Sequence, residues 1–83
     1  MAVTAIVDVP GHQHLTATER RALVAILNQE DVANDVRYKV GRKWYTLVGR
    51  DGCTAVRIEE IERDGFGLRH VRRRTVYFTA RSN

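Results

Sequence analysis

Hydrophobic and polar residues follow two periods along the chain, which divide it into a helical part and a sheet part. Residues 2–9 alternate loosely and end at Pro10-Gly11, which predicts one short strand. Thr16-Ala17-Thr18-Glu19 has the form of a capping box, in which the Thr16 hydroxyl and the Glu19 carboxylate each accept a backbone hydrogen bond from the other residue. Apolar residues at helical spacing follow, so we expect a helix over about residues 16–30; they are Ala22, Leu23, Ile26 and Leu27.

Beyond the helix the apolar residues recur at every second position, which is typical of an antiparallel sheet. Gly41-Arg42 suits a type II′ turn and Asp51-Gly52 a type I′ turn, which together pair Tyr45 with both Tyr38 and Ile58. One face of these strands should be buried, formed by Val36, Tyr38, Tyr45, Leu47, Val56 and Ile58. The opposite face should be solvated, formed by Arg37, Lys39, Trp44, Thr46, Val48 and Arg57.

A third turn, at Asp64-Gly65, returns the chain into the last part of the sheet. Pairing across this turn is expected to bring Glu60 near Arg69. Arg72-Arg73-Arg74 interrupts the alternation, and residues 75–80 are predicted as the final strand.

These elements predict an α+β domain with a short N-terminal strand, one helix and a four-stranded antiparallel meander over about residues 36–80. The meander can form an open sheet or close into a small SH3-like barrel. With 83 residues, 43% hydrophobic and 29% charged, the chain fits one small domain over residues 1–83, with residues 81–83 as a candidate disordered tail. So small a domain leaves little room for a walled active site, so we expect a non-catalytic protein without a cofactor.

Cysteine and histidine usage gives no signature of metal or thiol chemistry. Cys53 is the sole cysteine, which is typical of a reducing compartment, and no apolar run approaches the roughly 18 residues that span a bilayer. We therefore expect a cytoplasmic protein without a membrane partner. His12 and His14 have no further ligand at the spacing that zinc sites use, so no metal site is predicted, and the roles of His12, His14 and Cys53 stay open.

The charge is divided unevenly along the chain. Residues 1–35 carry two arginines and five acids, whereas residues 36–83 carry twelve basic residues and five acids. This asymmetry indicates a polyanionic partner. A tryptophan among cations on the solvated face can stack a base, and the arginine run can meet successive phosphates. The predicted nucleic-acid-binding residues are Arg37, Lys39, Trp44, Arg57, Arg69, Arg72, Arg73 and Arg74.

Two hypotheses for function follow from this charge map, and no motif in the chain indicates a known family. The first is a small non-catalytic module of bacterial or phage type that binds DNA or RNA or has a regulatory role. The alternative is a protein-interaction or inhibitor module, with a homodimer as one form, that docks through a sheet edge or through an acidic helix face with Glu19, Glu30 and Asp31. The exposure of Trp44 distinguishes them, because a buried indole removes the stacking platform.

Overall fold

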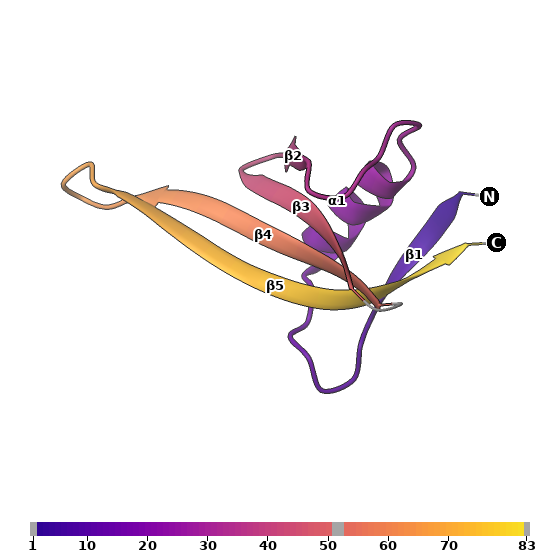
Figure 1. The fold of residues 1–83 in the computed structure, drawn as a ribbon. Helices are drawn as coiled ribbons and strands as arrows, with labels where there is room; N and C mark the ends of the chain where they lie inside the picture. Colours follow the sequence, from indigo (N-terminus) through magenta and orange to yellow (C-terminus); the bar gives the residue numbers. More distant parts are fainter. Residues whose placement is uncertain (1, 51–52, 83) are drawn as a thin grey trace.

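The fold is a curled five-stranded sheet with one helix on its concave side (Figure 1). The structure is a computed structural model that describes residues 2–50 and 53–82. Its strands form one antiparallel sheet in the order β1-β5-β4-β3-β2. The sheet is open, with β1 and β2 at its edges. The elements are β1 (Val3–Asp8), α1 (Ala17–Leu27), β2 (Arg37–Val40), β3 (Lys43–Arg50), β4 (Cys53–Arg63) and β5 (Arg69–Ser82).

The predicted α+β class is confirmed, and the N-terminal strand completes the sheet. β1 pairs with the end of β5, which places Ile6 opposite Ala80. Arg81 and Ser82, which belonged to the candidate tail, also pair with β1. The chain termini therefore meet at one sheet edge, as Figure 1 shows.

Helix α1 begins where the capping box predicts. The Glu19 amide donates to the Thr16 hydroxyl at 3.1 Å, and the Thr16 amide donates to a Glu19 carboxylate oxygen at 2.9 Å. The helix ends at Leu27, earlier than expected, because the Asn28 side chain turns to the backbone of β1. Its Oδ1 accepts from the Val3 amide at 2.8 Å and its Nδ2 donates to the Val3 carbonyl at 3.0 Å.

Thr16→Ala is expected to lower the free energy of unfolding by about 1 kcal/mol, because one amide at the start of α1 loses its partner. Urea denaturation followed by circular dichroism measures this loss. Thr18→Ala, an exposed threonine of the same turn, is the matched control and should leave stability unchanged or slightly raised. Equal unfolding midpoints for the two variants would contradict the capping role.

The hydrophobic core lies between α1 and the concave face of the sheet. Leu23 and Ile26 of α1 are fully buried against sheet residues. The predicted buried face is confirmed for Tyr45, Leu47, Val56 and Ile58, and Tyr38 packs at its margin. Val36 was wrongly placed there.

Val36 is 43% exposed because the chain enters β2 through a sharp turn. Asp35 adopts a left-handed conformation with φ of 63°, and its amide donates to the Leu47 carbonyl at 2.9 Å. β2 starts only at Arg37, so Val36 lies outside the paired ladder.

The register of the first hairpin agrees with prediction. Tyr45 pairs with Tyr38 on one side and with Ile58 on the other. Gly41 has φ of 64°, as the first central position of a type II′ turn requires. The predicted turn at Asp51-Gly52 lies outside the described residues.

The β4–β5 pairing differs from prediction by three residues. Glu60 lies opposite Arg72 instead of Arg69, and β5 runs through the arginine triplet without interruption. Because side chains alternate along a strand, Arg72 and Arg74 are on the helix side and Arg73 is on the opposite face. The side chains of the arginine triplet therefore alternate between the two faces of one continuous strand. The interruption of the strand predicted at this triplet was wrong.

The loop between β4 and β5 causes this shift. The Asp64 carboxylate accepts hydrogen bonds from the amides of Phe66 and Leu68, both at 2.9 Å, which stabilises a five-residue loop instead of a two-residue turn. Gly67, with φ of 77°, supplies the left-handed position that this loop needs. Residues 61–71 lie beyond the last β3 pair, and we call this two-stranded projection the ribbon (Figure 1).

Candidate nucleic-acid interface

The predicted binding residues divide between the two faces of the sheet. Two neighbouring cross-strand rows bring five of them together on the face away from α1. Lys39, Trp44, Glu59 and Arg73 form one row across β2, β3, β4 and β5, and Arg37, Thr46 and Arg57 form the next. We call this set the outer-face cluster: Arg37, Lys39, Trp44, Arg57, Glu59 and Arg73. Arg69 is on the same face farther along β5, whereas Arg72 and Arg74 are on the helix side.

Glu59 is the centre of the outer-face cluster. Its carboxylate is shared by three arginines, although the residue is only 8% exposed. Arg73 donates through Nε at 3.2 Å and Nη2 at 3.1 Å, while the Nε atoms of Arg37 and Arg57 lie 3.8 and 3.9 Å from the other oxygen. Each arginine side chain is at least 42% exposed. One negative charge therefore positions three guanidinium groups that still face solvent, and the cluster keeps a net positive charge.

The nucleic-acid hypothesis requires an exposed Trp44, and a buried Trp44 would favour the protein-interaction alternative. The side chain is half-buried, between these two outcomes. The Arg37 guanidinium carbon lies 4.3 Å from the centre of an indole ring, and the Lys39 ammonium lies 5.5 Å from it. These are cation–π contacts within the chain. The indole supports two cations and is not a bare stacking platform.

Thr46 departs from the predicted solvated face, because it is 1% exposed. In the register it lies directly between Arg37 and Arg57. The aliphatic parts of such long side chains cover small neighbours while their charged ends stay in water. The arginines of the outer-face cluster thus bury part of the sheet beneath them.

A hollow of about 220 Å³ adjoins the outer-face cluster at Arg57. Tyr77 and Thr75 form its β5 side, and His12 packs on Tyr77 with ring centres 4.9 Å apart. Val48 and Ala55 supply apolar surface there.

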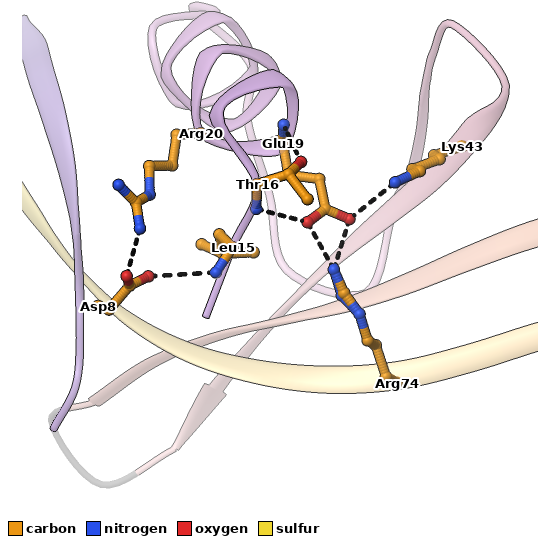
Figure 2. Close-up of polar contacts among 7 residues, drawn as sticks. All are labelled: Asp8, Leu15, Thr16, Glu19, Arg20, Lys43 and Arg74. Atoms are coloured by element: carbon orange, nitrogen blue, oxygen red, sulfur yellow. Dashed lines mark hydrogen bonds and ion pairs between the residues drawn. The ribbon is translucent and has the colours of Figure 1, made fainter. Parts of the chain in front are cut away.

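On the helix side the cations surround a different carboxylate, that of Glu19 (Figure 2). Glu19 has no exposed surface. Arg74 Nη2 lies 2.5 Å from both carboxylate oxygens, and Lys43 Nζ lies 3.0 Å from one of them. This one residue therefore connects the start of α1 with β3 and β5.

The electrostatics of Glu19 follow from these contacts. Burial alone would raise the pKa of Glu19, but hydrogen bonds from Arg74, the Thr16 amide and Lys43 outweigh it and lower the pKa to about 2. Burial and the nearby Glu19 charge raise the pKa of the Tyr45 hydroxyl. With this lowered pKa, the Glu19 carboxylate is ionised at neutral pH.

A pocket of about 440 Å³ opens beside Glu19, with charges of both signs in its wall. Arg72 lies there 3.6 Å from Glu62 of the neighbouring strand. Arg72 and Arg74 thus each have an acidic partner within the fold, and Arg74 is a structural residue. Burial of Glu19 also removes it from the acidic docking face of the alternative hypothesis.

The histidines also have partners within the chain. His14 Nδ1 lies 2.9 Å from Asp8, which also accepts from Arg20 and from the Leu15 amide. The hydrogen bond with His14 is the main cause that lowers the pKa of Asp8. Across residues 2–50 and 53–82, no three potential metal ligands lie together.

Sequence reasoning missed both acidic centres. Glu19 was identified as a capping residue and as part of an acidic docking face, but not as the partner of Arg74, which lies 55 positions away. Glu59 was not among the predicted site residues, and its three arginines come from three different strands, β2, β4 and β5. Only a correct β4–β5 register would have placed Arg73 beside it.

No protein-family model, curated protein or solved structure matches this chain. In the part of the chain that the structure describes, α1 is too short to cross a membrane.

Proposed function

We propose that this protein is a non-catalytic module that binds nucleic acid through the outer-face cluster. The observation that supports this proposal is the arrangement at Glu59, where one nearly buried carboxylate holds three solvent-facing arginines. Interior pairing accounts for Arg74 and Lys43, but it leaves the outer face with a surplus of positive charge. Exposed guanidinium groups match phosphate oxygens in charge and in hydrogen-bond geometry.

The cluster has the dimensions of a backbone-binding surface. It extends over four adjacent strands, β2 to β5, which at about 4.8 Å per strand spans roughly 14 Å. Its cations are held in place by Glu59 and by Trp44, so little side-chain freedom is lost when they meet phosphates. A set of fixed cations over this distance can contact several successive phosphates.

The same geometry favours recognition of the backbone over recognition of base sequence. Cations cover the indole of Trp44, so a base meets the Arg37 guanidinium and the Lys39 ammonium before it meets the ring. Contacts to phosphates position a protein on nucleic acid and carry no sequence information. We expect affinity that depends on ionic strength and varies little with sequence.

The test is a fluorescence anisotropy titration of labelled single-stranded and double-stranded DNA and RNA with the wild-type protein. Binding is expected at 50 mM salt and should weaken by roughly tenfold or more at 200 mM, because three or more phosphate contacts release counterions. Absence of binding to all four nucleic acids at 50 mM salt and tens of micromolar protein would overturn the proposal.

A further inference from the structure

The ribbon carries an almost fully exposed aromatic side chain at its tip. Phe66 is 92% exposed, and Leu68 and Val71 beside it are 62% and 49% exposed. Figure 1 shows that the β4–β5 hairpin holds this loop away from the rest of the molecule. Large apolar side chains gathered at one projecting place indicate a surface that becomes buried in a complex.

The loop that presents Phe66 is held together by Asp64. One Asp64 carboxylate oxygen accepts from the amides of Phe66 and Leu68 at 2.9 Å, and the other lies 2.9 Å from His70 Nε2. The Gly67 amide donates to the Asp64 carbonyl at 3.0 Å. Phe66 is therefore presented in a defined position before any partner binds, which reduces the ordering cost of binding.

A pair of cations lies at the base of the loop that carries Phe66. Arg63 and Arg69 face each other across the strand pair at the base of the loop. Within residues 2–50 and 53–82, neither has an acid within ion-pair distance. Arg69 also shares a face with Arg73 four residues along β5, roughly 13 Å away, so positive charge continues from the outer-face cluster to the tip.

We propose that Phe66 is a wedge that enters the minor groove of duplex DNA and inserts between two base pairs, while Arg63 and Arg69 contact the phosphates on either side. This inference rests on the proposed nucleic-acid function and specifies its ligand. Duplex DNA has an apolar base stack between two rows of phosphates, and an exposed aromatic tip with a pair of cations at its base complements this arrangement. Insertion of an apolar wedge at one step bends DNA by about 20–90°.

The experiment measures bending and affinity on the same duplex, about 30 base pairs long and labelled at both ends for energy transfer. Wild-type protein should raise the transfer efficiency. Phe66→Ala should abolish that rise and weaken duplex binding by roughly tenfold while leaving single-strand affinity unchanged, because a single strand has no stack to open. Phe66→Trp should retain the bend. Val36→Ala changes another exposed apolar residue, just before β2 and outside the ribbon, and should behave as wild type.

The outcomes separate the two proposals. Binding of both single strands and duplex without any bend would overturn the wedge and leave the proposed function standing. Failure of wild-type protein to bind any nucleic acid would overturn both. A dimer of wild-type protein that Phe66→Ala converts to a monomer in sedimentation would assign the tip to a second copy of the chain, and would also overturn the wedge.

Discussion

Glu19→Ala is expected to lower the free energy of unfolding by about 3–5 kcal/mol at neutral pH. The carboxylate lies between the start of α1 and two strands, where it accepts hydrogen bonds from Arg74, Lys43 and Thr16. Its removal leaves two partly buried cations facing each other without a counter-ion. Chemical denaturation of the variant and the wild type measures the difference.

The effect of Glu19 on stability should depend on pH in a defined direction. Its pKa is about 2 in the folded protein against 4.5 in the reference state, so the unfolded chain binds the proton first. The contribution is complete above about pH 5 and is lost as pH falls toward 2, a change of about 3 kcal/mol. The difference in free energy of unfolding between wild type and Glu19→Gln should therefore shrink as pH falls from 5 toward 2.

Glu30→Ala, an exposed acid just beyond α1, is the control and should change stability by less than about 0.5 kcal/mol. Wild-type stability of Glu19→Gln at pH 7 would contradict the structural role.

Replacing Arg37, Arg57 and Arg73 together by alanine is expected to weaken nucleic-acid binding by on the order of 10²–10³-fold at 50 mM salt. Arg73 hydrogen-bonds to Glu59 and the other two arginines lie within ion-pair distance of it, while each side chain is at least 42% exposed, so each can neutralise one phosphate. The estimate follows from the counterions that three phosphate contacts release. Anisotropy titration with a labelled duplex measures the loss.

Two further variants extend this experiment. One is a matched control, and the other is expected to change nucleic-acid affinity in the opposite direction. Replacing Arg21, Arg42 and Arg81 by alanine removes the same charge from exposed positions outside the outer-face cluster, and should weaken binding only severalfold. Glu59→Gln removes the competing carboxylate and should tighten binding, although it leaves the arginines less well ordered. Equal losses in the two triple variants would mean that net charge, and not the outer-face cluster, determines binding.

Local patterns were enough to predict the helix start and the first hairpin. The Thr16 capping box and the positive φ at Gly41 depend on neighbouring residues, so their sequence signals are direct. The face shared by Arg37, Lys39, Trp44 and Arg57 followed from the registers expected for β2 with β3 and for β3 with β4. Four of the predicted binding residues could therefore be brought together from the sequence.

Individual side-chain contacts, some local and some between distant residues, account for what could not be predicted. The Asp64 side chain widened the last loop, and a register shift of three residues exchanges the two faces of a strand. Arg73 therefore joined the outer face, and Arg74 turned toward Glu19. The helix end depended on Asn28 meeting the edge of β1, which no local pattern indicates.

The most direct test of the central claim is the slope of log Kd against log salt for wild type and for the Arg37, Arg57 and Arg73 triple variant on the same duplex. Each phosphate contact contributes about 0.9 to this slope. If the outer-face cluster binds the phosphate backbone, the slope for this triple variant is shallower by about 2–3. The slope for the Arg21, Arg42 and Arg81 variant stays close to that of wild type. Identical slopes and affinities for wild type and the Arg37, Arg57 and Arg73 variant would contradict the assignment of nucleic-acid binding to the outer-face cluster.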